Sequence, residues 1–198
     1  MRALGIALAF GGLLVSACSP EKVRVGFDSN LRLAPPVAAA RPVIAVGSFA
    51  DKRGQGAYYL GTIRGHFGEP AMRVVTDEPI GELVRKGFGE GLAARGLLSD
   101  RPDALYTLSG VIAKFDCNRY VRQEADAELA LVLTQTSTGN VLMSRTVKRL
   151  NRSDRAPDGS PDRSASVDDL RNLAQQTLQE VVDQALDNPE LLNLVRPP

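Results

Sequence analysis

The stretch from Gln123 to Gln135, QEADAELALVLTQ, alternates between apolar and polar side chains. The apolar set is Ala125, Ala127, Leu129, Leu131 and Leu133, while Asp126 and Glu128 fall on the opposite face. A period of two residues is typical of a β-strand with one buried face and one face in water. The chain is therefore expected to build a sheet that is covered on one side only.

Two further strands are predicted beside this one. Residues 103–120 carry Tyr106 and Leu108 on one phase, and Val111, Ala113 and Phe115 on the other. The phase changes at Ser109–Gly110, which predicts a β-bulge at that point. TSTGN (136–140) has the composition of a turn, and 141–150 returns as a strand. The short connections predict an antiparallel meander of three strands.

Four glycines at Gly87, Gly89, Gly91 and Gly96 raise the question of a phosphate-binding loop. The apolar and small residues around them instead follow a helical period: Ile80, Leu83, Val84, Gly87, Phe88, Gly91 and Leu92. Gly96 stands where a helix C-cap belongs. A phosphate loop would precede its helix and end in Lys-Ser/Thr, so the pattern predicts a helix and no nucleotide site. Gly87 and Gly91 then predict close packing of this helix on the sheet.

A second helix is predicted after a polar loop. Ser166 and Asp169 have the spacing of a capping box. The apolar stripe that follows is Val167, Leu170, Leu173, Ala174, Thr177, Leu178, Val181, Val182 and Ala185. Residues 189–198 are expected to form a frayed turn and a tail.

The order of these elements predicts the fold class. Residues 42–51 form an apolar, β-branched run that is typical of a buried first strand. Strand, helix, three antiparallel strands and helix together predict an α+β two-layer sandwich over 42–188, with the helices on one side of the sheet. Val23, Val25 and Phe27 alternate, so an extra, loosely docked N-terminal edge strand is a further expectation.

Residues 1–17 have the composition of a secretory leader. Arg2 precedes an apolar run from Ala3 to Val15, which is shorter than the roughly 20 residues that span a membrane. Val15-Ser16-Ala17-Cys18 resembles the lipobox of bacterial lipoproteins. The resemblance implies cleavage between Ala17 and Cys18, and acylation of the Cys18 thiol and of the new amine. Ser19 in place of aspartate fits sorting to the outer membrane. Residues 18–41 would then be the lipidated N-terminus and a proline-containing tether.

A long polar segment, 52–73, contains five glycines and no apolar period, so a loop is predicted there. It carries the candidate partner surface: Tyr58, Tyr59, Arg64, His66 and Phe67. Aromatic residues with arginine are enriched at protein interfaces. The alternative is that this loop folds back and covers one end of the core.

Basic residues cluster between Arg145 and Arg152. The candidate contacts to an anionic lipid, lipopolysaccharide or an acidic partner are Arg145, Lys148, Arg149 and Arg152, with Arg155 just beyond. The alternative is a solvated strand edge whose charges oppose edge-to-edge aggregation.

Other chemistry is not predicted. His66 is the only histidine, and the sequence has no nucleophile motif or metal-ligand spacing, so we expect no catalysis, metal or cofactor. The 24 basic and 23 acidic residues do not indicate nucleic-acid binding. Once Cys18 is acylated, Cys117 has no partner within the chain and is either buried or paired between chains.

Three segments carry a resemblance to the YajG family of bacterial outer-membrane lipoproteins: residues 61–98, 106–116 (YTLSGVIAKFD) and 136–142 (TSTGNVL). The order of elements is more loosely similar to that of the peptidoglycan-synthase activator and curli-secretion lipoproteins. The resemblance implies a fold and an outer-membrane location, without catalytic residues to transfer. The expected function is that of a lipid-anchored, periplasm-facing binding or scaffold module with an envelope protein as partner. The alternative is an auxiliary lipoprotein of an envelope lipid transporter or an activator of peptidoglycan synthesis.

Overall fold

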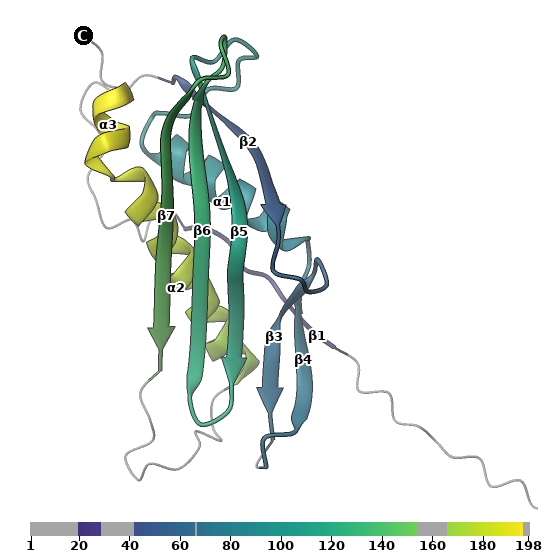
Figure 1. Cartoon of the computed structure of the whole chain (residues 1–198). Helices are drawn as coiled ribbons and strands as arrows, with labels where there is room; N and C mark the ends of the chain where they lie inside the picture. Colours follow the sequence, from purple (N-terminus) through teal and green to yellow (C-terminus); the bar gives the residue numbers. More distant parts are fainter. Residues whose placement is uncertain (1–19, 29–41, 66, 154–165, 196–198) are drawn as a thin grey trace, which may run out of the picture.

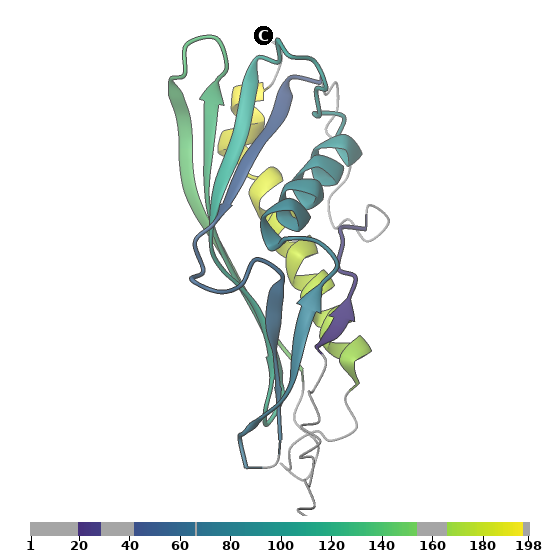
Figure 2. The ribbon, with the colours of Figure 1, turned by 90° about the vertical axis from the view of Figure 1, so that its right-hand side faces the viewer.

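The structure is a computed structural model that describes residues 20–28, 42–65, 67–153 and 166–195. In these ranges the chain forms β1 (Glu21–Val23), β2 (Ile44–Asp51), β3 (Tyr59–Arg64), β4 (Pro70–Thr76), α1 (Ile80–Ala94), β5 (Tyr106–Arg119), β6 (Gln123–Gln135), β7 (Val141–Arg152), α2 (Val167–Leu186) and α3 (Pro189–Val195) (Figure 1). The strands make one open sheet, and the helices cover one of its faces (Figure 2). The predicted two-layer α+β sandwich is confirmed.

The sheet is organised around β5. The strand order is β1-β4-β3-β5-β6-β7, and β2 pairs with β5 outside this path. β2 runs parallel to the first half of β5, from Ile44 opposite Tyr106 to Asp51 opposite Ile112. β3 pairs with the far end of β5, where Ile63 lies opposite Arg119. The β5–β6–β7 meander is antiparallel, as predicted.

The predicted alternation of β6 is confirmed, because every second residue from Ala125 to Leu133 is buried. The bulge predicted in β5 at Ser109–Gly110 lies elsewhere in that strand, because the register of β5 against β6 shifts between Ile112 and Lys114. Beside Ser109 the irregularity belongs to β2, whose register against β5 shifts between Val46 and Phe49, opposite Leu108 and Gly110. Gly110 has a different role. A Cβ there would lie 2.7 Å from the Phe49 ring, so the glycine allows β2 to approach closely.

Both predicted helices form, with the predicted start of α2 and the predicted end of α1. Ser166 and Asp169 make a reciprocal capping box at α2, and Gly96 has a φ of 68° just after α1. The packing of the glycines in α1 differs from the prediction. A Cβ on Gly87 would lie 3.3 Å from Leu178, and one on Gly91 would lie 2.6 Å from Val182. The two glycines therefore let α1 approach α2 and not the sheet.

The two helices are also joined by a buried ionic network. The Arg95 side chain is fully buried. It donates to both carboxylate oxygens of Asp187, at 2.8 Å each, and to Asp183 at 2.7 Å. Burial by itself would lower the pKa of Arg95, but the hydrogen bonds to Asp187 and Asp183 raise that pKa above its ordinary value. The guanidinium is therefore held charged where α1 ends against α2.

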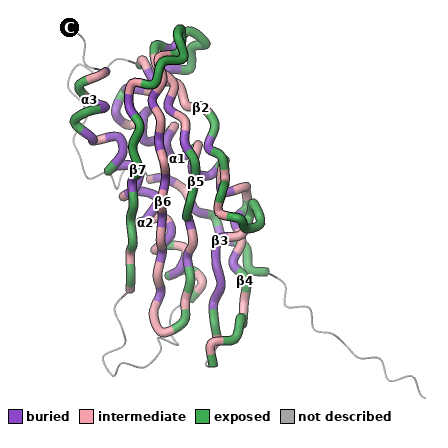
Figure 3. The backbone as a smooth tube through the Cα atoms, in the orientation of Figure 1, coloured by how far each residue is buried: buried purple, intermediate pink, exposed green. Residues whose placement is uncertain are grey.

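Three segments are more ordered than the sequence predicted. The N-terminal edge strand expected from the alternation of Val23, Val25 and Phe27 forms as β1, at the edge of the sheet beside β4. All three side chains are buried, so this segment is not loosely docked, and residues 20–28 do not belong to the predicted tether. Residues 189–195 form α3 and bury Leu191 and Val195, so they are not a frayed tail. The loop predicted over 52–73 is largely the β3–β4 hairpin. Figure 3 shows burial along the middle of the molecule and exposed chain at both ends.

Candidate functional site

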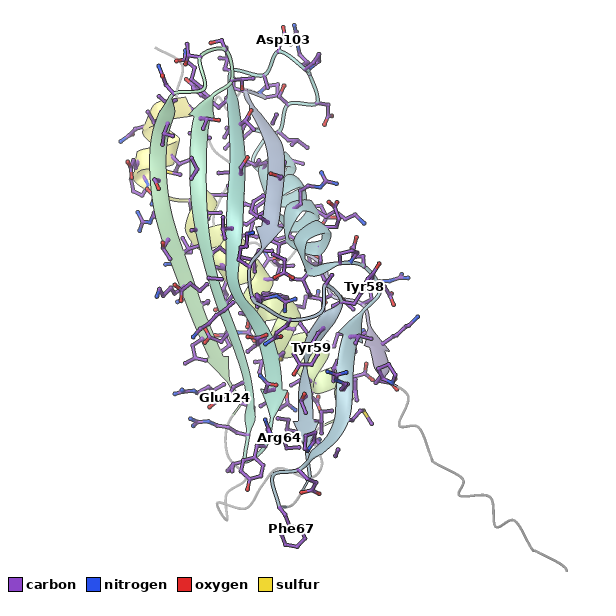
Figure 4. The ribbon with its side chains drawn as sticks, turned by 45° about the vertical axis from the view of Figure 1, so that its right-hand side comes forward. Tyr58, Tyr59, Arg64, Phe67, Asp103 and Glu124 are labelled. Atoms are coloured by element: carbon purple, nitrogen blue, oxygen red, sulfur yellow. The ribbon has the colours of Figure 1, made fainter. Side chains whose placement is uncertain are left out.

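The β3–β4 hairpin separates the predicted partner residues. Tyr58 precedes β3 and is 50% exposed, while Phe67 lies at the hairpin tip and is 88% exposed. Figure 4 shows these two residues at opposite ends of the hairpin, with Tyr59 and Arg64 between them. His66 lies outside the described residues. The hairpin therefore presents two separate exposed aromatic positions and not one continuous patch.

Tyr59 and Arg64 mainly support the hairpin itself. The Tyr59 hydroxyl lies 2.7 Å from the hydroxyl of Thr62, and the guanidinium of Arg73 lies 5.8 Å from the centroid of the Tyr59 ring. The Arg64 side chain donates to the backbone oxygen of Gly68 at 2.9 Å. Both predicted contact residues are thus engaged in contacts within the hairpin.

The tip of the hairpin is braced by hydrogen bonds. The Phe67 amide donates to the Glu69 carboxylate at 3.0 Å, and the Gly65 amide donates to the Glu69 carbonyl at 2.8 Å. Gly68 has a φ of 85°, a left-handed conformation that favours glycine. A Cβ on Gly68 would lie 3.6 Å from the Tyr120 ring, so the tip rests beside the β5–β6 turn. Tyr120 is 46% exposed, and this end of the molecule therefore carries two exposed aromatic rings.

The predicted basic cluster is divided between the two faces of the sheet. Arg145 lies opposite Leu131 and Arg149 lies opposite Ala127, so both are on the helix-covered face. Arg149 forms an ion pair with Glu180 of α2 at 3.1 Å. Lys148 and Arg152 lie on the open face, where Lys148 pairs with Glu128 at 3.0 Å and Arg152 with Glu124 at 3.1 Å. Arg145 has no ion pair with another described residue.

The open face beside these residues carries balanced charge. Lys114 of β5 pairs with Asp126 of β6 at 3.2 Å. This is a cross-strand pair of the same kind as those of Lys148 and Arg152 with the carboxylates of β6. Burial raises the pKa of Asp116; nearby Arg53 opposes this effect, and Asp126 on the facing strand adds to it. Exposed pairs of this kind contribute at most about 1 kcal/mol each. The face therefore offers alternating charges and no strongly basic surface.

A groove that the sequence did not predict runs beside α1. It has a volume of about 560 Å³, and its floor includes Ala45 and Val46 of β2 with Gly89 and Ala93 of α1. This volume lies in the range of sites that hold small molecules or peptide side chains. Gly89 and Ala93 are four residues apart and outside the buried stripe of α1, and these two small residues were the only sequence signal for the groove.

Charged side chains line the rim of this α1 groove. Lys86 and Glu90 line both the groove and an adjoining hollow of about 440 Å³ between α1 and residues 24–26. Burial raises the pKa of Glu90, an effect that Lys86 opposes and Glu78 reinforces. Lys86 also forms an ion pair with Glu78. The α1 groove thus combines an apolar floor with charges of both signs, which suits a partner with mixed polarity.

Cys117 is buried against α2, which is one of the two alternatives left open by the sequence. Its thiol lies 3.3 Å from the carbonyl oxygen of Leu170, to which it donates. Burial, reinforced by Asp116, raises the pKa of Cys117 to about 12. The thiol is therefore protonated at neutral pH and is not a reactive nucleophile.

Two further properties hold within the part of the chain that the structure describes. None of the helices there combines the length and the apolar composition needed to cross a bilayer. No group of three or more His, Cys, Asp or Glu residues in the same ranges has a geometry that could hold a metal ion.

Comparisons with known proteins identify similar folds. No protein-family model matches the chain, and no curated protein matches it either. A crystal structure of a Xanthomonas campestris protein of family DUF330 has 15% identity and a TM-score of 0.64, covering 87% of this chain and 96% of that protein. A second, uncharacterized protein has 13% identity and a TM-score of 0.51, covering 85% and 99%. At these identities the likeness shows a shared fold and nothing about function.

A more distant structural neighbour is a minor lipoprotein from Acinetobacter baumannii. It has 14% identity and a TM-score of 0.40, covering 54% of this chain and 82% of that protein. The similar structures thus include a bacterial lipoprotein, but a likeness at this level supports no inference about this chain. The YajG resemblance stays a prediction.

Proposed function

We propose that the protein is a lipid-anchored, periplasm-facing binding or scaffold module of the bacterial cell envelope, without catalysis. The observation that carries this proposal is the position of β1, which begins at Glu21, three residues after Cys18. An acylated Cys18 would thus be joined directly to a strand of the folded domain. Two or more acyl chains, at about 0.8 kcal/mol per buried methylene, would hold that domain stably at the membrane.

The α1 groove is the surface that best supports a binding role. Its lining includes the small residues Ala45, Gly89 and Ala93, so a partner side chain or short segment could reach the backbone of α1 and β2. Its rim charges, Lys86 and Glu90, lie on the solvent-facing side of α1. Small apolar floors with polar rims are common in binding sites, where shape gives affinity and charge gives orientation.

Photocrosslinking in intact cells tests this role. A photoreactive amino acid in place of Ala93, which is exposed in the α1 groove, is expected to give discrete adducts with an envelope component. The same amino acid at Thr138, in the exposed β6–β7 turn, is the matched control. Combining the Ala93 probe with Cys18→Ala should abolish the adducts, because the domain would no longer be held at the membrane.

The nature of the adduct separates the alternatives. A protein adduct supports the binding module, and a cell-wall synthase as that protein would favour the activator of peptidoglycan synthesis. A phospholipid adduct would favour an auxiliary lipoprotein of a lipid transporter. Equal labelling at Ala93 and Thr138, or adducts that persist with Cys18→Ala, would contradict the proposed anchored function.

A further inference from the structure

We propose that the end of the molecule formed by the β3–β4 tip and the β5–β6 turn faces the bilayer, with the Phe67 ring inserted at the lipid–water interface. This end is called the tip end, and it comprises residues 64–65, 67–69 and 119–122. The inference rests on the proposed acylation of Cys18. It adds an orientation and a second, non-covalent contact with the membrane to that proposal.

The direction of β1 selects this end. β1 is parallel to β4, with Glu21 opposite Val74 and Val23 opposite Thr76. Moving from Glu21 toward Cys18 therefore moves in the direction of Pro70, where β4 emerges from the hairpin tip. Three residues span at most roughly 11 Å. An acylated Cys18 would thus be held close to the tip end.

The length of the sheet excludes the opposite end from the same contact. β6 has 13 residues and β7 has 12, and at about 3.3 Å per residue such strands are roughly 40 Å long. The β6–β7 turn lies at the far end of these strands from the tip end (Figure 1). Val141 and Leu105 near that turn are also exposed, at 60% and 58%, but a short anchor beside β1 would hold them far from the bilayer.

The tip end has the chemistry of a membrane interface. Phe67 and Tyr120 are its exposed aromatic residues, and aromatic rings are enriched where a protein meets the headgroup layer. Phe67 is directed outward from the hairpin in Figure 4. The hydrogen bonds from Arg64 to Gly68 and from the Phe67 amide to Glu69 fix the loop that presents it. Inserting the ring therefore requires little additional ordering of the backbone.

The charge of the tip end also fits contact with a membrane. Arg64, Arg119 and Arg122 belong to it, whereas Glu69 is its acidic residue and Glu124 lies just beyond. Among the described residues of the tip end the arginines outnumber the carboxylates, and Arg122 pairs with Glu124 at 2.8 Å. Arginine side chains beside an exposed aromatic ring favour a surface that contains anionic lipid.

A tryptophan reporter tests the orientation, because the chain contains no tryptophan. Phe67→Trp places a single reporter at the tip end, and Val141→Trp places one at the opposite end. Both native residues are exposed, so neither change should disturb the core. The mature lipidated variants would be reconstituted into phosphatidylethanolamine and phosphatidylglycerol vesicles with and without brominated acyl chains.

Brominated lipids are expected to quench the fluorescence of the Phe67→Trp variant at least about threefold more than that of the Val141→Trp variant, since an interfacial ring lies within about 5–10 Å of the acyl boundary. Flotation with the vesicles reports the anchor separately. Protein that floats while the Phe67→Trp signal is unquenched would overturn the orientation and leave the anchor intact. Protein that does not float would contradict the anchor and, with it, the orientation.

Discussion

Replacing Arg95 with methionine is expected to destabilise the protein by about 3–5 kcal/mol, because the change leaves two carboxylates facing a space without a cation. Asp183 is almost fully buried and Asp187 is partly buried, and both accept hydrogen bonds from the guanidinium. Urea unfolding of the mature protein, followed by circular dichroism, measures the loss.

Two controls isolate the ionic network. Arg85→Met removes an exposed pair with Glu82 on the same helix, and it should cost less than about 1 kcal/mol. Adding Asp183→Leu and Asp187→Leu to Arg95→Met replaces all three charged groups by apolar ones and should recover part of the lost stability. The recovery is incomplete because the buried Gln179 amide, which donates to Asp183 at 3.0 Å, loses its acceptor. A loss for Arg95→Met no larger than that for Arg85→Met would show that the network does not join the helices as described.

Replacing Gly61 with alanine is the second change with a large expected effect. A Cβ at this position would overlap the carbonyl oxygen of Cys117 and come 2.6 Å from its carbonyl carbon. Both are backbone atoms of β5, so no side-chain rotation can relieve the overlap. The β3–β4 hairpin would have to move away from β5. This movement would disturb the pairing of β3 with β5, in which Ile63 lies opposite Arg119. We expect a loss of at least about 2–3 kcal/mol in the free energy of unfolding.

Gly56→Ala is the matched control for Gly61→Ala. A Cβ on Gly56 would have its nearest neighbour 4.0 Å away, at Tyr59. That substitution should be neutral or stabilise the protein by up to about 1 kcal/mol, because it restricts the unfolded chain. Equal unfolding free energies for the two variants would contradict the close approach of β3 to β5.

The parts of the fold that the sequence predicted are those that carry a complete local pattern. β6 alternates without interruption, and α2 has both its capping box and a long apolar stripe. Each pattern can be interpreted without knowing what packs against it. The two-layer arrangement then follows, because each helix and the sheet must cover one apolar face.

The parts that the sequence did not predict depend on partners distant in the chain. β3 and β4 are short and have no clean alternation of apolar and polar residues. Their place in the sheet becomes visible only when Gly61 meets β5 and Val74 pairs with β1. Gly87 and Gly91 indicate a close approach, but the element that approaches is α2, whose contacting residues Leu178 and Val182 each lie 91 positions later in the sequence. The position of the bulge in β5 is similarly set by pairing with β6.

For the candidate surfaces too, the sequence identified single residues but not how the fold arranges them. Arg145, Lys148, Arg149 and Arg152 are neighbours in the sequence, but the two-residue period of β7 sends them to opposite faces of the sheet. Phe67 was identified as an exposed aromatic residue, whereas the approach of the tip to Tyr120 required the folded hairpin. The α1 groove requires α1, β2 and the segment around Leu98 together, and no single stretch of sequence contains it.

The anchor at Cys18 is the central claim of this account, and the mass of the mature N-terminus tests it most directly. Protein extracted from the membrane fraction should yield an N-terminal peptide that begins at Cys18 and carries both a thioether-linked diacylglycerol and an amide-linked acyl chain. The Cys18→Ala protein should be soluble or should retain its leader. A peptide that still begins at Met1, or a Cys18 with a free thiol, would contradict the anchor and the envelope function that depends on it.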